Sequence, residues 1–168
     1  MSEIVSPTDE NLIQLEGEEC FLKHAKKITA QATREICILS DELDRPIFNE
    51  QELVDTMSAF VRNNRNCTIK ILVKNVRPIV ERGHSLLLLA RRISSKIIIK
   101  KLLLDPKDNA IAYVIGDKKL LLYKHSDKEY TGFVNYAAGP ESKKLLEEFV
   151  YLWEQHSVED PELKQLTI

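Results

Sequence analysis

Three short apolar runs, each preceded by a stretch with helical spacing, constrain the fold of this chain most. Residues 35–39, 68–73 and 96–104 are rich in Ile, Leu and Val and end in polar positions, which is typical of buried strands. Residues 18–33, 53–61 and 78–93 place apolar side chains three and four positions apart, which indicates helices. Because strands that alternate with helices pair in parallel, we expect an α/β fold with a mixed, mostly parallel sheet flanked by helices.

The last third of the chain has a different pattern. Residues 110–115 and 120–123 predict two strands joined by a hairpin turn at residues 116–119, and residues 130–135 predict another strand. Gly139 and Pro140 then open a helix with a broad apolar face that extends to Trp153. A short strand at residues 12–15 is expected before the first helix. We therefore expect a single domain over residues 11–168, after a flexible leader at residues 1–10.

The formal net charge of the 168 residues is only −2, but the charges are unevenly distributed. Residues 62–107 hold 12 Lys and Arg against 2 Asp and Glu, whereas residues 1–61 and 108–168 are both acidic. Such asymmetry predicts an anionic partner, nucleic acid or a phosphorylated ligand. A basic segment that is neutralised by its own acidic flanks has the same pattern, so both interpretations stay open.

Within the basic segment, Gly83 interrupts the helical pattern, and a helix that restarts there offers backbone N–H groups to an anion. The candidate anion-binding residues are the basic side chains around this break and along the following helix and strand: Arg82, His84, Arg91, Arg92, Lys100 and Lys101. Arg91 and Arg92 can instead offset the dipole at the end of their helix. Binding through such residues is salt-dependent and has little sequence preference. No aromatic residue lies between Arg62 and Pro106, which disfavours single-strand recognition by stacking.

Signatures of cofactor or metal chemistry are absent from the sequence. It has no glycine-rich phosphate loop, and its four histidines lack metal-ligand spacing, so we predict no cofactor and no metal site. An acidic loop with Asp41, Glu42 and Asp44 is consistent with either Mg²⁺ ligands or solvated turn carboxylates. The cysteines form no CxxC pair, and we expect all three to be small buried side chains in a reducing, cytoplasmic compartment: Cys20, Cys37 and Cys67. No apolar run is long enough to span a membrane.

The segment Ala110-x-Ala112-x4-Asp117 is followed along the chain by the segment from Gly132 to Asn135. These two segments resemble the phospholipase D superfamily, whose sites carry His-x-Lys-x4-Asp followed by Gly-Ser-x-Asn. Asp117, Gly132 and Asn135 match this pattern, whereas alanines stand at the His and Lys positions and Phe133 stands at the Ser position. The resemblance implies a phospholipase D-like sandwich with a degenerate active site.

The span from about Phe21 to Leu166 is also similar to an uncharacterised bacterial group with a phospholipase D-like fold, found alone or attached to acetyltransferase domains. The segments that carry this similarity are residues 38–44, 71–73, 82–92 and 152–154. Superfamily members with one motif per chain tend to pair, so the resemblance implies a homodimer. It also implies that standard phosphodiesterase chemistry is lost, because alanine can neither attack phosphorus nor transfer a proton.

Three functional hypotheses follow. The first is a non-catalytic domain that holds an anionic partner through the basic central segment. The second is a structural or protein-interaction module, for example a homodimer, whose basic middle meets acidic surfaces. The third is a phosphodiesterase with unorthodox residues, such as His84 with Asp41 or Asp117, which requires those side chains to lie within hydrogen-bond reach.

Overall fold

The computed structural model describes residues 11–164, and the expected leader at residues 1–10 lies outside this range. Its elements, in chain order, are β1 (Leu12–Glu16), α1 (Glu18–Gln31), β2 (Glu35–Ser40), α2 (Arg45–Phe48), α3 (Gln51–Asn63), β3 (Thr68–Val73), α4 (Arg77–Glu81), α5 (Ser85–Arg92), β4 (Ile97–Leu102), β5 (Ala112–Gly116), β6 (Leu120–Ser126), β7 (Glu129–Asn135), α6 (Gly139–Gln155), β8 (Ser157–Val158) and α7 (Pro161–Lys164). The strands and the long helices lie close to where the sequence pattern predicts them. The sequence pattern did not predict β8 or α2 as separate elements.

All eight strands form one sheet in the order β1-β7-β6-β5-β2-β3-β4-β8. Within residues 11–164, β2, β3 and β4 pair in parallel, and the other five neighbouring pairs are antiparallel. The α/β class is confirmed, but the expectation of a mostly parallel sheet is wrong. The reason is that β5, β6 and β7 follow one another through tight turns, and such connections can only join antiparallel strands. The two edge strands, β1 and β8, add further antiparallel pairs.

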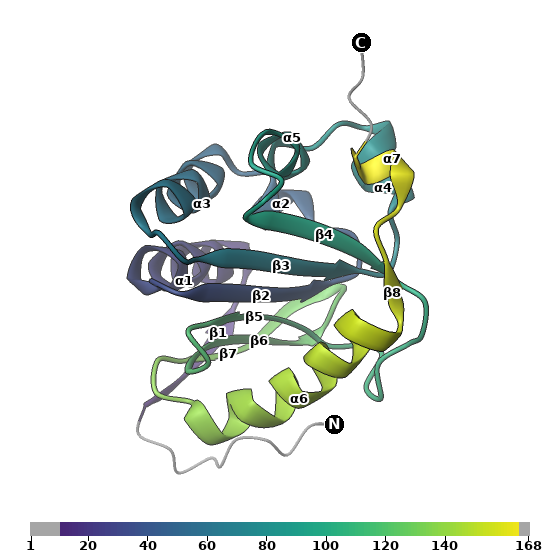
Figure 1. Ribbon diagram of the computed structural model, residues 1–168. Helices are drawn as coiled ribbons and strands as arrows, with labels where there is room; N and C mark the ends of the chain where they lie inside the picture. Colours follow the sequence, from purple (N-terminus) through teal and green to yellow (C-terminus); the bar gives the residue numbers. More distant parts are fainter. Residues whose placement is uncertain (1–10, 165–168) are drawn as a thin grey trace.

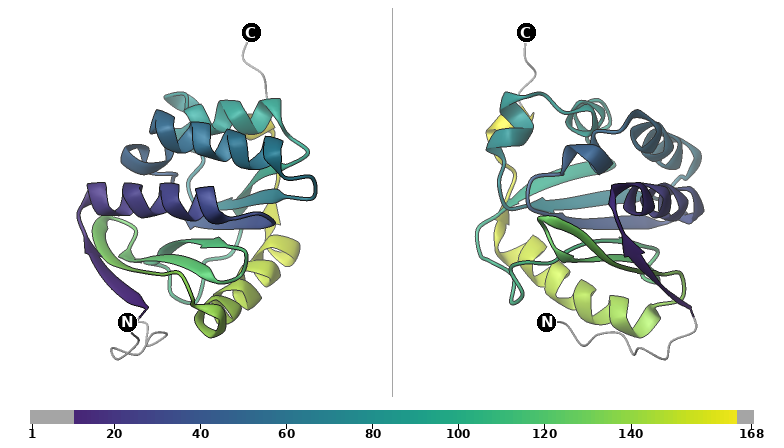
Figure 2. Two further views of the ribbon diagram at one scale, coloured as in Figure 1. Left: turned by 90° about the vertical axis from the view of Figure 1, so that its left-hand side faces the viewer. Right: turned by 180° about the vertical axis from the view of Figure 1, so that it is seen from behind.

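Helices cover the two faces of the sheet unequally (Figures 1 and 2). The first face packs against α1, α3 and α5, with Ile28, Met57 and Leu86 in its core. The second face packs against α6 through Phe149 and Trp153. The strands alternate between these two cores, because successive side chains of a strand point to opposite faces.

The sheet has two chemically different ends. The parallel strands β2, β3 and β4 all begin at the end where α1, α3 and α5 terminate, and they all finish at the end that carries α2 and α4 (Figure 1). The turn between β5 and β6 lies beside the start of β2, since Asp117 N–H donates to the Glu35 carbonyl at 2.9 Å. We call these the amino end and the carboxyl end of the parallel strands. Among the described residues, no helix is long and apolar enough to cross a membrane.

Candidate anion-binding site

His84 caps α5 from inside the protein and does not face a ligand. Its side chain is buried, Nδ1 accepts a hydrogen bond from Leu86 N–H at 3.2 Å, and Nε2 lies 2.9 Å from the Leu43 carbonyl oxygen. Only the neutral tautomer with the proton on Nε2 satisfies both contacts. Burial lowers the pKa of His84 below its ordinary value, which further favours the uncharged ring. The expected role of His84 in anion binding is therefore not supported by its contacts.

The helix restart at Gly83 forms as expected, but its first N–H groups already have partners. Gly83 has a φ of +69°, which ends α4 and lets α5 begin in a new direction. Ser85 N–H donates to Asn49 Oδ1 at 2.8 Å, and Leu86 N–H donates to His84. Arg82 stays exposed beside this turn, in a hollow of about 220 Å³ that also contains two carboxylates and Arg45. The predicted anion site at the helix restart is thus occupied by the protein's own acceptors.

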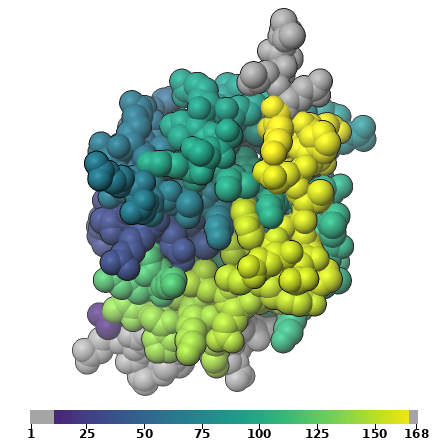
Figure 3. Space-filling model, viewed as in Figure 1, coloured from purple at the N-terminus to yellow at the C-terminus, as the bar shows by residue number. Residues whose placement is uncertain are grey.

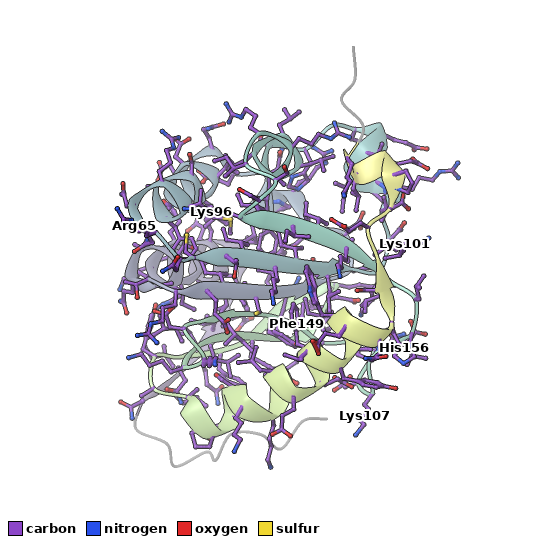
Figure 4. All side chains as sticks on the ribbon, in the orientation of Figure 1. Arg65, Lys96, Lys101, Lys107, Phe149 and His156 are labelled. Atoms are coloured by element: carbon purple, nitrogen blue, oxygen red, sulfur yellow. The ribbon has the colours of Figure 1, made fainter. Side chains whose placement is uncertain are left out.

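The other basic residues of the predicted anion site are distributed over separate parts of the molecule. Arg91 donates to the carbonyl oxygens of Glu162 and Leu163 at 2.8 and 3.0 Å and so holds α7 against α5. Lys100 lies on the second face of the sheet, with Nζ 4.5 Å from the centroid of the Trp153 ring. Lys101 lies near the carboxyl end of β4, far from the amino end that Arg65 and Lys96 mark in Figure 4.

Arg92 ends α5 at the amino end and is exposed. Strand alternation explains the separation of Lys100 from Lys101, because neighbouring residues of a strand point to opposite faces. The six predicted side chains therefore form no single site.

The residues that match the superfamily pattern hold the backbone together. The carboxylate of Asp117 accepts hydrogen bonds from Thr33, Arg34 and Glu35 N–H at 2.8–3.1 Å. Burial raises the pKa of Asp117, but these backbone donors outweigh it and the net pKa is lowered. Asp117 thus fixes the start of β2 at the amino end.

Gly132 and Asn135 lie elsewhere, along β7. A Cβ on Gly132 would lie 1.9 Å from the Tyr123 carbonyl oxygen, so only glycine fits beside β6. Asn135 is fully buried, and its Oδ1 accepts a hydrogen bond from Ala137 N–H at 2.8 Å. Asp117 and Asn135 therefore lie toward the amino end, away from Ala112.

At the carboxyl end, a closed network of charges that the sequence pattern does not predict lies beside Ala112. Lys124 lies directly opposite Ala112 in the register of β5 and β6 and is 7% exposed. Its Nζ is 3.7 Å from Asp44 Oδ2 and 4.2 Å from the centroid of the Tyr130 ring. Tyr130 donates its hydroxyl proton to the same Asp44 oxygen at 2.5 Å. Burial, together with this hydrogen bond, raises the pKa of Tyr130.

A second ion pair extends this closed network. Lys74 lies 3.3 Å from Asp127 Oδ2 and also donates to the Asn109 carbonyl oxygen, while Lys124 donates to the Asp127 carbonyl oxygen at 3.1 Å. Asp44 therefore serves as an ion-pair partner and not as a freely solvated turn carboxylate. The described residues contain no cluster of three His, Cys, Asp or Glu that could hold a metal ion. One signal in the sequence could have revealed the network, namely Lys124 at the end of the apolar run Leu120–Tyr123.

At the amino end, five exposed basic side chains surround the starts of the parallel strands. We call this set the basic rim: Arg34, Arg62, Arg65, Arg92 and Lys118. Backbone hydrogen bonds from Thr68 N–H to the Arg34 carbonyl, at 3.1 Å, and from Ile69 N–H to the Lys96 carbonyl, at 2.7 Å, join these starts. Figure 4 shows Arg65 and Lys96 together at this end.

The members of the basic rim lack the ion pairs that bind the lysines of the closed network. Within residues 11–164, none of the five forms an ion pair. Arg62 and Arg92 lie in the last turns of α3 and α5, where cations offset the helix dipoles. Arg34, Arg65 and Lys118 lie in loops, so the dipoles do not account for them. The basic rim therefore places five positive charges, without ion-pair partners among the described residues, on one exposed surface.

Two of the cysteines are buried as expected, but the prediction is wrong for Cys20, which is exposed on α1. That position faces away from the sheet, because the buried face of α1 carries Phe21, Ala25 and Ile28.

Comparisons with solved structures show which folds are similar. The archaeal chromatin protein TrmBL2 aligns over 91% of this chain with a TM-score of 0.62 and 16% identity, and this chain spans 56% of its length. NucT from Helicobacter pylori aligns over 86% of this chain and 95% of its own, with a TM-score of 0.55 and 12% identity. Phosphatidylserine synthase from Haemophilus influenzae Rd KW20 aligns over 85% of this chain and 37% of its own, with a TM-score of 0.53 and 12% identity.

These similarities establish the fold as phospholipase D-like. No curated protein matches the sequence. A family model does match, over residues 17–166, and the chain therefore belongs to the family described as "Domain of unknown function (DUF7931)".

Proposed function

We propose that this domain is a non-catalytic module that binds the phosphate backbone of a nucleic acid. The observation that carries the proposal is the basic rim, in which exposed basic side chains from three loops and two helix ends lie at one end of the sheet without ion-pair partners in the described chain. Nucleic acids present closely spaced phosphates. Several basic side chains on one protein surface therefore gain affinity by neutralising these phosphates together.

The basic central segment contributes to this proposal in a revised form. Of the six basic residues predicted from the sequence to bind an anion, only Arg92 belongs to the basic rim. Arg62 and Arg65, from the same segment, also belong to it. Arg34 and Lys118 come from outside this segment. Contacts of this kind go to phosphates and not to base edges, so we expect strong salt dependence and weak sequence preference.

The absence of catalysis is proposed on chemical grounds. Ala110 and Ala112 offer neither a nucleophile nor a proton donor. His84, which the alternative catalytic hypothesis requires, has both ring nitrogens engaged by Leu86 N–H and the Leu43 carbonyl. Asp117 lies at the other end of the sheet and is held by backbone N–H groups. Lys124 is enclosed by Asp44 and Tyr130.

One structural neighbour is compatible with the proposed partner. The structure of the chromatin protein TrmBL2 is described as showing a novel mode of DNA binding. The similarity in fold to this protein supports the proposal only by analogy, so the binding surface has to be tested on this chain itself.

The test compares the two ends of the sheet. Fluorescence anisotropy with labelled DNA and RNA oligonucleotides at low salt should show binding by the wild-type protein, and the double variant Arg65→Ala/Arg92→Ala should bind at least tenfold more weakly. The matched control Arg77→Ala/Arg82→Ala removes two exposed basic side chains at the carboxyl end. It should leave the affinity for the oligonucleotides nearly unchanged. Undetectable binding at low salt, or equal losses in both variants, contradicts the proposal. Hydrolysis of an activated phosphodiester that depends on His84 or Lys124 would contradict its non-catalytic part.

A second candidate function, a protein-interaction module such as a homodimer, is favoured by exposed apolar side chains near α6 and β8. Leu103, Leu104, Tyr151 and Val158 are 64%, 45%, 52% and 42% exposed, and Leu104 and Tyr151 line one hollow beside α6. Light scattering should give twice the monomer mass for the wild-type protein and the monomer mass for Leu104→Asp/Tyr151→Asp. A monomer mass for the wild-type protein at micromolar concentration would contradict the homodimer.

A further inference from the structure

The second face of the sheet contains a hollow of about 510 Å³, which we call the Trp153 hollow. It lies between α6, the first halves of β2 and β3, and the turn between β5 and β6. Side chains of α6 (light green) and of β2 and β3 (blue) meet along this face in Figure 3, and Figure 4 shows Phe149 between α6 and the sheet. The floor of the hollow is apolar, with Cys37, Phe149 and Trp153. Burial, aided by nearby Glu35, raises the pKa of the Cys37 thiol to about 12, so the floor carries no thiolate.

Three lysines border this hollow. Lys70 comes from β3, Lys118 from the β5–β6 turn and Lys143 from α6. None of the three forms an ion pair with a residue in the range 11–164, and Nζ of Lys70 lies 5.5 Å from the centroid of the Trp153 ring. Lys118 is also a member of the basic rim. The hollow is therefore continuous with the surface that attracts phosphates.

Three carboxylates share the border with the lysines: Glu35, Glu147 and Glu154. Their charges offset those of the three lysines, so the border of the hollow offers a phosphate group no net positive charge. The carboxylates suit a neutral group with N–H donors, since a carboxylate accepts hydrogen bonds from the amino group of a base. An apolar floor with such acceptors at its border matches a flat heterocycle. The volume lies within the usual range for small-ligand pockets.

We propose that the Trp153 hollow receives one unpaired base of a single-stranded nucleic acid whose backbone lies on the basic rim. This inference rests on the proposed function and adds a preference for single strands over duplexes. A flexible single strand can turn a base away from its neighbours, whereas a duplex base must first break its pairing and stacking. The basic segment itself contains no aromatic residue between Arg62 and Pro106, so the sequence alone disfavours aromatic contacts with single strands. The fold brings Trp153 to that segment from α6, because Lys70 and Lys100 Nζ lie 5.5 and 4.5 Å from the centroid of its ring, and Phe149 lines the same hollow as Lys70.

Trp153 is the only tryptophan of the chain, so its fluorescence reports on the hollow directly. Three oligonucleotides of equal length should be titrated at low salt: a mixed-sequence single strand, the same strand with every position abasic, and the duplex. Anisotropy of a labelled end measures binding, and Trp153 emission measures occupancy of the hollow. All three probes should bind, but only the single strand with bases should change the emission, and its affinity should exceed that of the abasic strand about tenfold.

The variant Val150→Tyr fills the mouth of the hollow from an exposed position of α6. It should abolish the emission change and reduce the affinity for the single strand to that for the abasic strand. The matched control Gln155→Tyr places the same side chain on an exposed position of α6 that does not line the hollow, and it should behave like the wild-type protein.

The possible results separate the two proposals. If the single strand binds without a change in Trp153 emission, or if Val150→Tyr binds it as tightly as the wild-type protein, the inference about the hollow is wrong and the basic rim stands. If no DNA or RNA probe binds at low salt, the proposed function fails and this inference fails with it.

Discussion

The two ends of the parallel strands contain similar kinds of side chains but use them in opposite ways. At the carboxyl end, Lys74 and Lys124 are largely buried, and each lies within 4 Å of a carboxylate. At the amino end, the arginines of the basic rim are exposed and have no ion-pair partner in the described chain. Both ends draw on the same basic central segment. A count of charges in a segment therefore reveals little about binding until the paired charges are separated from the unpaired ones.

The difference also reverses a common expectation about α/β proteins. In open sheets, ligands usually bind at the carboxyl ends of parallel strands. Here the network of Asp44, Lys124 and Tyr130 occupies that end beside the exposed Arg77 and Arg82, and the basic rim lies at the opposite end. Interactions within the closed network should stabilise the fold, and interactions at the basic rim should determine binding.

The largest expected effect is on the closed network. Asp44→Ala leaves the buried Lys124 ammonium without its carboxylate, and we expect a loss of about 3 kcal/mol in the free energy of unfolding. The double variant Asp44→Ala/Lys124→Met should lose less than the sum of the single variants, because both charges are removed together. Urea denaturation gives these values.

The control for this prediction is Glu81→Gln, which breaks an exposed ion pair with Arg77 and should cost less than about 1 kcal/mol. Equal losses for Asp44→Ala and Glu81→Gln would show that the closed network stabilises the fold no more than an exposed ion pair does.

The next effect concerns the basic rim and its dependence on salt. Arg65→Ala/Arg92→Ala should reduce the slope of log K against log salt for duplex DNA by about 2, since each arginine neutralises one phosphate. The stability of the double variant should change by no more than about 0.5 kcal/mol per substitution. An unchanged slope measured by anisotropy between low and moderate salt would remove these arginines from the binding surface.

A smaller effect is expected at Asp117, which organises the amino end. Asp117→Ala removes the acceptor of three backbone N–H groups that water can partly replace, so we expect a loss of about 1 kcal/mol in stability. It should also weaken DNA binding, because Arg34 and Lys118 lose their fixed loop. Asp117→Asn keeps an acceptor oxygen and tolerates the φ of +49°, so its effects should be smaller. Identical behaviour of the two variants in urea denaturation would contradict this role.

The smallest effect is a pH dependence that belongs to the carboxyl end. Burial lowers the pKa of folded His84 below 6.5, so between its folded and unfolded pKa values the unfolded chain binds more protons. The contribution of His84 to stability is therefore complete above pH 6.5 and is lost as the pH falls below that value.

His84→Asn keeps a residue that caps helices well and should make the decrease in stability between pH 7 and pH 5 shallower. His24, whose pKa burial also lowers, retains its own share of the decrease. Urea midpoints at three pH values test this, and parallel curves for the variant and the wild type would refute it. Affinity for DNA should not follow this profile, because the arginines stay charged throughout.

Much of the fold follows from local patterns in the sequence. The parallel strands, the break at Gly83 and the hairpin at Gly116 were predicted because periodicity and turn residues are local signals. The direction of β5, β6 and β7 in the sheet depends on which strands pair, and the pairing of β2 with β5 joins residues about 80 positions apart. No local signal specifies such a contact.

The candidate site was less predictable for the same reason. Whether a basic side chain has an ion-pair or hydrogen-bond partner depends on residues that are distant in the sequence. Lys124 meets Asp44 across the sheet, and Arg91 meets the carbonyl groups of α7. The six candidate basic residues appear equivalent in the sequence but have different roles in the structure. For example, His84 caps a helix, Lys100 packs on an aromatic ring, and Arg92 remains exposed.

The position of β1 in the sheet has a consequence for the order of folding. β1 pairs with β7, so that Leu12 lies opposite Asn135 although more than a hundred residues separate them. Closing so long a loop costs more chain entropy than any hairpin in the protein, and such contacts form late and slowly. We therefore expect the amides of β1 to gain protection from hydrogen exchange last during refolding, after the β5–β6–β7 meander has provided the edge to which β1 adds.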